Sequence, residues 1–167
     1  TFIRLYVDDN GGLGYPTYNE TAYFGSVFNK FLGQVIGSER IFENDVPVYR
    51  YADVILLLAE TKNLLGEDPS GEINQIRERA YGENYMPLIH SYTNGSQTEN
   101  ANAILDERYK EFIGEGKRWW DLRRAGDSFV FDNVSFLNPG DEFKLVLPIT
   151  TDMIGRNPLL EQTPGYN

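Results

Sequence analysis

Carboxylates near the middle of the chain are the side chains best suited to acid–base chemistry. Glycoside hydrolysis requires only two such groups, about 5 to 9.5 Å apart, and the candidates are Glu107, Glu111, Glu115 and Asp121. Glu107 and Glu111 lie one helical turn apart, a spacing that surface charges on helices also show. In a chain with 25 acidic residues, such spacings also arise by chance. We therefore favour ion pairing, assign no catalytic residue, and keep a glycoside hydrolase that uses Glu111 and Glu115 as a rival hypothesis.

The sequence predicts no cofactor and no metal site. The chain has no Cys and one His, His90, which excludes a Cys-based zinc site, an iron–sulfur cluster and a His-rich metal site. A phosphate-binding loop around residues 114–118 fails because the Walker pattern needs Gly at Glu111 and Ser or Thr at Arg118. Residues 8–11 could begin a calcium loop, but the spaced oxygen ligands and the closing Glu do not follow. The phosphate-loop hypothesis is therefore rejected, and residues 8–11 are interpreted as a turn.

Aromatic residues make up 14% of the chain, with 11 Tyr and 10 Phe. Tyr rings have flat apolar faces and a polar edge, which suits them to binding sugars as well as to core packing. Tyr15, Tyr18 and Tyr23 occur in a Gly-rich, loop-like stretch near the N-terminus. We predict these three residues as candidate carbohydrate-binding residues, with core packing as the alternative for any one of them.

The charge balance excludes other classes of ligand. The formal net charge is −10, from 25 acidic and 15 basic residues, whereas binding to nucleic acid or to an anionic membrane needs a clustered positive field. No apolar run approaches the roughly 18 residues of a membrane span. The chain begins at Thr1 without an initiator Met or a signal peptide, so we expect any targeting signal to lie outside it.

A chain of 167 residues suits one domain, in which three segments differ in pattern. Residues 1–45 are loop-rich and broken by glycines, which predicts short strands and turns. Residues 46–126 are helical: from 46 to 65 apolar residues lie almost all round the helix, which predicts a buried helix. A second helix with Ser70 as its N-cap would complete a helical hairpin.

Further helices are expected at residues 99–113 and 117–125, ending near Gly114 and at Gly126. The stretch between them and the hairpin, residues 82–97, is expected to be a loop. Residues 127–167 are expected to form a strand and an extended tail. The strand would cover residues 143–149, and Thr150 or Thr151 would cap one last helical turn.

Three stretches, in the same order, resemble the C-terminal region of the SusD/RagB family. The first is PVYRYADVILLLAE at residues 47–60, followed by INQIRERA at 73–80. The second joins Glu107, Arg108 and Glu111 to EGKRWWDLRR at residues 115–124. The third is LPI at residues 147–149 with NPLLEQTPGY at 157–166, where Thr163 replaces the usual Asn. The order and length of these matches make the resemblance specific.

The resemblance implies a mainly α-helical protein with tetratricopeptide-like hairpins, irregular loops and short strands. It also implies a non-catalytic lipoprotein on the outer membrane of Bacteroidetes-type bacteria, which captures oligosaccharides or polysaccharides for a SusC-like TonB-dependent transporter. The lipid anchor and most hairpins would precede Thr1, so membrane association would come from outside this chain. An assembly module that docks the transporter without binding sugar is a second alternative.

The matched motifs are interpreted as scaffold and not as sugar contacts. Their residues are Arg50, Tyr51, Asp53, Glu115, Arg118, Trp119, Trp120, Asp121 and Arg124. Trp119 and Trp120 are consecutive, and successive residues of a helix point about 100° apart, so at most one of the two rings can face a ligand. At least one of them is expected in the core.

Overall fold

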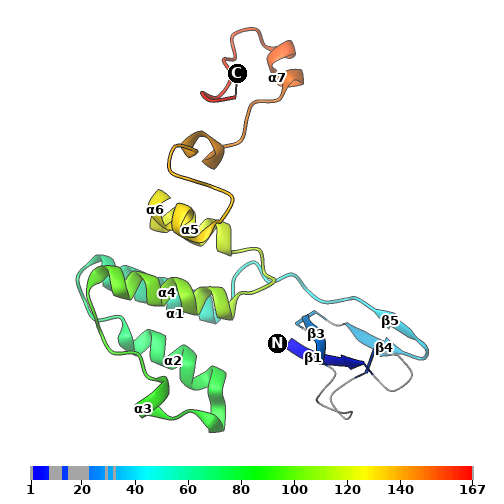
Figure 1. Ribbon diagram of the computed structural model, residues 1–167, viewed down its shortest axis with the longest axis vertical. Coiled ribbons are helices and arrows are strands. Elements are labelled where there is room, and N and C mark those ends of the chain that lie inside the picture. The colour runs from blue at the N-terminus through cyan, green and yellow to red at the C-terminus, as the bar shows by residue number, and fades with distance from the viewer. Residues whose placement is uncertain (1, 8–12, 15–22, 29, 32, 167) are drawn as a thin grey trace. The chain divides into compact units, whose positions relative to one another are not determined.

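A computed structural model describes residues 2–7, 13–14, 23–28, 30–31 and 33–166, and up to residue 28 it describes the backbone alone (Figure 1). The chain divides into two compact units, Thr1–Val48 and Tyr49–Asn167, which are treated separately below. This boundary lies close to the expected change from a loop-rich to a helical segment after residue 45. That the two units act as one domain stays a prediction.

The N-terminal unit contains the short strands that its glycine-rich sequence predicts. Its strands are β1 (Phe2–Val7), β2 (Leu13–Gly14), β3 (Tyr23–Phe28), β4 (Gln34–Ile36) and β5 (Glu39–Ile41). One antiparallel sheet has the order β2-β1-β3, and β4 and β5 form a separate hairpin. The hairpin turns at Gly37, whose φ of +66° suits the first position of a tight two-residue turn.

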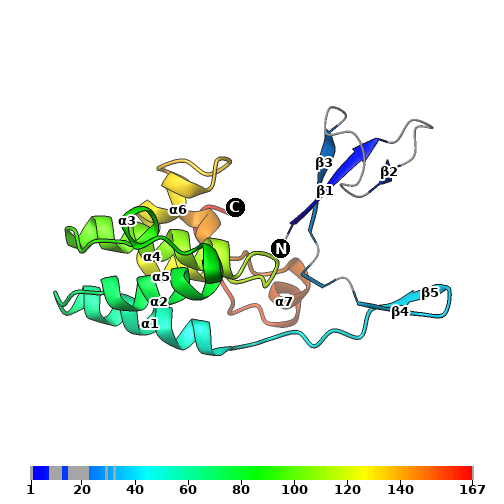
Figure 2. The ribbon, with the colours of Figure 1, turned by 90° about the horizontal axis from the view of Figure 1, so that it is seen from below.

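The second unit is mainly α-helical, which confirms the expected fold class. Its elements are α1 (Tyr51–Leu64), α2 (Ser70–Tyr81), η1 (Gly82–Asn84), α3 (Pro87–His90), α4 (Gln97–Glu111), α5 (Arg118–Ala125), α6 (Asp127–Asn133), η2 (Glu142–Leu145) and α7 (Thr151–Arg156). The hairpin of α1 and α2 packs against α4, and α5 contacts both α4 and α6 (Figures 1 and 2). The packing therefore brings α1, α4 and α5 together from distant parts of the sequence.

The core consists of apolar clusters on these helices. The clusters between α1, α2 and α4 are built from Ala52, Ile55, Leu56, Ala59, Ile73, Ile76, Ile104 and Phe112. A further cluster, formed by Leu105, Leu122, Val130, Leu137 and Leu145, extends from α4 to η2. Leu56 and Ile73 are fully buried, so the hairpin and α4 form a closely packed centre for the unit.

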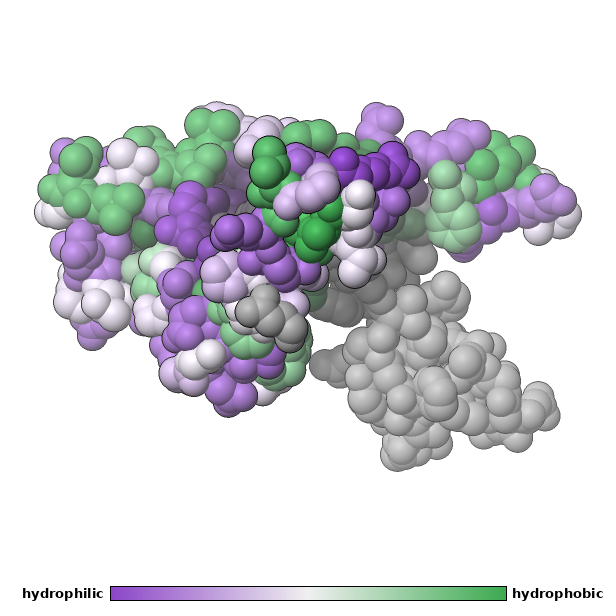
Figure 3. All heavy atoms as spheres, turned by 90° about the horizontal axis from the view of Figure 1, so that it is seen from above, coloured by the Kyte–Doolittle hydropathy of each residue, from purple (hydrophilic) through white to green (hydrophobic). Residues whose placement is uncertain are grey.

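The outward face of α1 differs from the expectation that this helix is buried all round. The exposed fractions are 72% for Tyr51, 58% for Val54 and 48% for Leu58, which lie on one side of the helix at spacings of three and four residues. The residues of α1 that are buried in the described part of the chain, among them Ala52, Ile55, Leu56 and Ala59, lie elsewhere on the helix and belong to the core clusters with α2 and α4. The space-filling view shows exposed hydrophobic residues, in green, on the surface of the helical unit (Figure 3).

A double variant, Val54→Lys with Leu58→Lys, is expected to leave the free energy of unfolding of this chain almost unchanged. Substitutions at exposed positions usually change it by less than about 0.5 kcal/mol each. Leu56→Ala, on the buried side of the same helix, is the matched control and should lower it by about 2 to 5 kcal/mol. Urea unfolding followed by circular dichroism measures both, and a double variant as unstable as Leu56→Ala would show that this face is buried.

The N-terminal caps of α2 and α4 differ from what the sequence predicts: the expected cap of α2 is wrong, and α4 has a cap that was not predicted. Ser70 is the first residue of α2 and not its N-cap; Pro69 holds that position, and the Ser70 N–H donates to Asp68 Oδ1 at 2.8 Å. A side chain two residues back has therefore taken the role predicted for the serine. In α4, Ser96 forms a capping box with Glu99. The hydrogen bond that the Ser96 hydroxyl donates to the Glu99 carboxylate is the main cause of the lowered pKa of Glu99.

The strand expected at residues 143–149 is wrong. Residues 127–133 form α6 and residues 142–145 form η2, while residues 146–149 run extended without pairing to a strand among the described residues. Side chains of the tail take the place of a partner strand. The Gln162 amide both accepts from Ile149 N and donates to Ile149 O, each at 2.8 Å. Because these side chains satisfy the backbone, the segment needs no sheet.

The C-terminal tail is held against the same extended segment. Tyr166 donates its hydroxyl to Val146 O at 3.0 Å and lies edge-on to Phe143, with ring centroids 5.2 Å apart. Gly165 has a φ of +94°, and a Cβ there would lie 2.4 Å from Phe143 Cγ, so only glycine fits. The expected last helical turn is confirmed as α7, whose N-cap Thr150 accepts from Met153 N.

Candidate functional site

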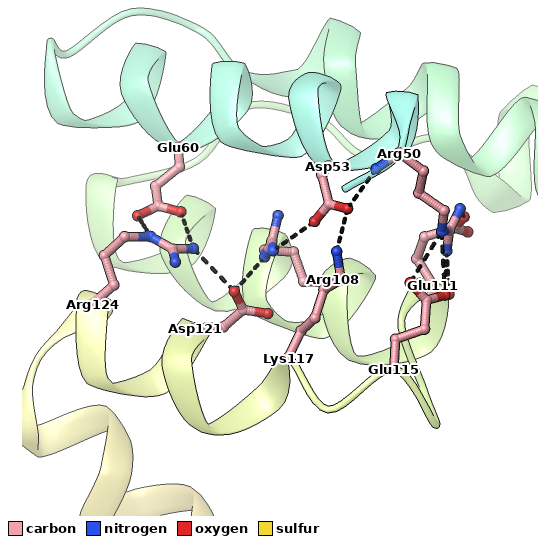
Figure 4. A network of polar contacts seen from close by, with 9 residues as sticks. All are labelled: Arg50, Asp53, Glu60, Arg108, Glu111, Glu115, Lys117, Asp121 and Arg124. Atoms are coloured by element: carbon pink, nitrogen blue, oxygen red, sulfur yellow. Dashed lines mark hydrogen bonds and ion pairs between the residues drawn. The ribbon is translucent and has the colours of Figure 1, made fainter. Parts of the chain in front are cut away.

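A buried ion network joins α1, α4 and α5 and contains most of the motif residues that the sequence singled out (Figure 4). Its centre is Arg108 on α4, whose Nη2 lies 3.2 Å from Asp53 Oδ1 on α1 and whose Nε lies 2.8 Å from Asp121 Oδ1 on α5. The side chains of all three residues are at most 3% exposed. One arginine therefore links three helices through two carboxylates.

The network continues beyond the start of α1 through Arg50 and Lys117. Lys117 forms an ion pair with Asp53, and Arg50 N donates to Asp53 Oδ2 at 3.2 Å. The Arg50 guanidinium donates to Glu115 at 2.9 Å and forms an ion pair with Glu111. Burial acts to lower the pKa of Arg50, but the hydrogen bonds to Glu115 and Glu111 outweigh it and raise this pKa.

At the other end of the network, Arg124 on α5 connects back to α1. Its Nε and Nη2 donate to the two carboxylate oxygens of Glu60 at 2.7 and 2.8 Å, a bidentate pair. Arg124 Nη2 also donates to Asp121 at 3.1 Å. The hydrogen bond to Glu60 is the main cause of the raised pKa of Arg124. Figure 4 shows the dashed contacts that run from Glu60 to Arg124, from Arg124 to Asp121 and from Asp121 to Arg108.

The aromatic ring of Phe112 adds an apolar partner for the same cations. The guanidinium carbons of Arg50 and Arg108 lie 4.6 and 4.8 Å from its ring centroid, and Lys117 Nζ lies 4.9 Å from it. Cations at this distance are attracted by the negative face of the ring. Phe112 is 3% exposed, so its ring is part of the core and contacts these cations inside the protein.

Glu111 and Glu115, the two carboxylates of the rival hydrolase hypothesis, both form ion pairs with arginines. Glu111 pairs with both Arg50 and Arg79, and Glu115 pairs with Arg50. Their side chains are 10% and 0% exposed. Both carboxylates are therefore largely shielded from solvent. No group of three or more potential ligand residues, counted over the described residues, could hold a metal ion.

A hollow of about 320 Å³ lies beside the network, and its wall includes Tyr109, Lys117, Arg118 and Trp119. The cations in this wall already have partners. Lys117 pairs with Asp53, and Arg118 donates to Leu105 O at 2.8 Å and to Asn133. A ligand in this hollow would therefore meet Lys117 and Arg118 already paired with other groups of the protein.

The two tryptophans differ in their surroundings. Trp119 is half-buried and packs against the cluster that contains Leu122 and Val130, whereas Trp120 is 68% exposed. Tyr51, another motif residue, is exposed at the start of α1. Most motif residues therefore contribute to the ion network or to the core. The exposed exceptions are the rings of Tyr51 and Trp120.

The sequence analysis did not identify Arg108 as the centre of the network. A signal was present, because Arg108 shares one face of α4 with Ile104, Leu105 and Phe112, all of them buried. A charged residue at such a position must have partners in the core. The partner Asp53 is fully buried on the α1 face that carries Ala52 and Leu56.

The predicted sugar-binding residues lie in the N-terminal unit. Tyr15 and Tyr18 fall outside the described residues, and Tyr23 is described by its backbone alone, as the first residue of β3. The backbone of Tyr23 pairs with that of Tyr6 in β1. Their role in binding stays a prediction.

The sequence model of the SusD family matches residues 10–166. The chain is 32% identical over 137 residues to the SusD-like protein P38 of Formosa agariphila, covering 77% of this chain and 26% of that protein. It is 34% identical over 131 residues to the starch-binding protein SusD of Bacteroides thetaiotaomicron, covering 74% and 22%. The chain thus spans about a quarter of the length of the curated relatives it matches.

Two solved structures are also similar to this chain in sequence and in fold. B. fragilis NanU is 38% identical with a TM-score of 0.79, covering 100% of this chain and 35% of that one. A SusD superfamily protein from Bacteroides fragilis is 35% identical with a TM-score of 0.81, covering 100% and 37%. None of the helices in the described residues is long and apolar enough to cross a membrane.

Proposed function

Because this chain belongs to the SusD family, we propose that it is part of a protein that captures glycans at the bacterial surface and does not cleave them. Family membership is the observation that carries this proposal, since it supports a glycan-binding accessory role in nutrient uptake. One relative is named as a starch-binding protein. The glycan would be an oligosaccharide or polysaccharide bound by aromatic stacking and hydrogen bonds.

The proposal includes a partner and a location. The captured glycan would be delivered to a SusC-like TonB-dependent transporter of the outer membrane. The protein would be a surface-exposed lipoprotein of a Bacteroidetes-type bacterium, held at the membrane by a lipid anchor outside this chain. Retention of the protein by such a transporter in a pull-down experiment tests the partnership.

Binding is tested by titration calorimetry of this chain against a panel of oligosaccharides. The panel contains hexasaccharides of α-linked glucose, β-linked glucose, mannose and xylose, together with hexagalacturonate. We expect at least one of them to bind, and we expect Tyr15→Ala, Tyr18→Ala or Tyr23→Ala to weaken that binding. If all three variants stay folded and bind unchanged, these tyrosines are not the site. If the unmodified chain binds no glycan, capture by this part of the protein is refuted.

The arrangement of three candidate carboxylates supports the proposal that the glycan is not cleaved. A glycosidase needs a proton donor and a nucleophile or base that both face the substrate. In this protein Glu111 and Glu115 face Arg50, and Glu107 pairs with Arg77 at 2.7 Å. Each of these three carboxylates is therefore engaged by an arginine, which supports the proposal that none of them acts on a glycosidic bond.

The exposed face of α1 favours a second candidate function, an assembly module that docks the transporter and binds no sugar. Exposed apolar surface of this kind often marks contacts between proteins. In that case no glycan of the panel would bind, and the transporter would still retain the chain. The Val54→Lys and Leu58→Lys double variant would then lose retention without losing stability.

A further inference from the structure

The connector between α2 and α4 carries an aromatic cluster that the proposed function has not used. Tyr81, the last residue of α2, stacks on His90 of α3 with ring centroids 3.9 Å apart and an interplanar angle of 3°. The ring of Tyr85 lies 5.9 Å from His90 and 6.5 Å from Tyr81, tilted to both. These distances place the three rings in one group, and Figure 1 shows α3 near α2.

Hydrogen bonds fix the orientation of these rings. His90 Nδ1 accepts from Met86 N at 2.9 Å, which holds the imidazole plane. The Tyr85 hydroxyl is hydrogen-bonded to Ser91 Oγ at 2.8 Å. Because Nδ1 is an acceptor, the neutral imidazole carries its proton on Nε2, which is a donor at the edge of the cluster. The rings are therefore preorganised.

The backbone of the connector is also fastened to α2. Asn74 exchanges two hydrogen bonds with the backbone of Tyr92, at 2.9 and 2.6 Å, and Arg77 Nη1 donates to His90 O at 2.9 Å. A loop held in this way loses little conformational entropy when it binds a ligand. This distinguishes the cluster from aromatic side chains that merely happen to be exposed.

Part of the cluster is accessible to solvent. Tyr81 is 47% exposed although its ring stacks on His90, so about half of this residue can be reached by a ligand. An accessible tyrosine ring beside donors and acceptors is the arrangement that a pyranose ring uses, with its C–H face on the aromatic ring and its hydroxyls toward polar edges. The hydroxyls of Tyr81 and Tyr85 and Nε2 of His90 supply such edges.

The charges near the cluster indicate a neutral ligand. Arg77 pairs with Glu107, and Arg79 pairs with Glu111. The guanidinium groups closest in sequence to the cluster are therefore engaged with carboxylates of α4. The cluster offers ring faces and neutral hydrogen-bonding groups, which suit an uncharged sugar better than a uronic acid.

We propose that Tyr81, supported by His90 and Tyr85, is a stacking platform for one neutral pyranose unit of the glycan. This proposal rests on the proposed function, because it assigns a binding site within glycan capture. It places a site in the helical unit, separate from Tyr15, Tyr18 and Tyr23. The connector between α2 and α4 lies outside the sequence motifs matched above, and this proposal gives it a role in binding.

Titration calorimetry with the four neutral hexasaccharides and hexagalacturonate tests the platform. For the neutral sugar that binds most tightly, Tyr81→Ala should weaken binding by about tenfold, because the stacked face is lost. Tyr81→Phe keeps the ring and should stay within about threefold of the unmodified chain. Phe136→Ala is the matched control, since Phe136 is 77% exposed and lies outside the cluster; it should not change binding.

The outcomes separate this proposal from the proposed function. If a neutral sugar binds and Tyr81→Ala binds it as tightly as the unmodified chain, the platform is wrong and glycan capture stands. If hexagalacturonate alone binds, the neutral assignment is wrong. If no sugar of the panel binds to the unmodified chain, both proposals are wrong for this chain. Far-ultraviolet circular dichroism of each variant confirms that it is folded.

Discussion

Replacing Arg108 with methionine is expected to lower the free energy of unfolding by about 3 to 5 kcal/mol. The substitution removes the only cation that links Asp53 on α1 with Asp121 on α5 among the described residues. Both carboxylates stay buried, with exposed fractions of at most 3%, and each loses a partner. A buried charge left with fewer partners costs more than the ion pair itself contributes. Urea unfolding followed by circular dichroism measures the loss.

Arg156→Met is the matched control for this experiment. Arg156 also pairs with an aspartate, Asp152, at 3.0 Å, but both side chains are more than two-thirds exposed. Exposed pairs contribute little because water screens them. A control as unstable as Arg108→Met, or an Arg108→Met variant as stable as the parent, would contradict the role given to the network.

Trp119→Ala is expected to lower the free energy of unfolding by about 3 kcal/mol, the lower end for truncating a packed tryptophan. In a chain of this size such a loss corresponds to a decrease in melting temperature of about 6 to 12 °C. Trp120→Ala should leave the melting temperature almost unchanged, because Trp120 is 68% exposed. The two substitutions remove the same side chain from adjacent positions, so each serves as the control for the other.

Thermal melting and glycan titration of both tryptophan variants decide whether the motif is scaffold. We expect stability to change in the Trp119 variant and sugar affinity to change in neither. If both variants melt like the parent while glycan binding is lost, the binding site lies in the motif and the scaffold interpretation is wrong.

The helices could be predicted from the sequence because their signals are local. Gly126 ends α5 as expected, and the periodic apolar residues of α4 predict its position to within two residues at each end. The apolar composition of α1 also predicts a helix. It does not reveal how much of that helix is covered, because coverage depends on which elements pack beside it, and Val54 and Leu58 remain exposed.

The features that sequence analysis missed depend on contacts between distant residues. The strand expected at residues 143–149 does not form, since Gln162 satisfies the backbone of Ile149 in place of a neighbouring strand. The position of Arg108 between two aspartates requires α1 and α5 to lie on either side of α4. The stacking of Tyr81 on His90 likewise depends on the turn between them, which no periodic pattern encodes.

The central claim, that this chain binds a glycan and leaves it intact, is tested most directly by recovering the glycan after binding. The chain is incubated to equilibrium with the hexasaccharide that gives a heat of binding, and the recovered sugar is separated by chromatography. We predict saturable binding and recovery of the hexasaccharide at its original length. Shortened products that disappear in a folded Glu111→Gln or Glu115→Gln variant would contradict this claim and establish the hydrolase in its place.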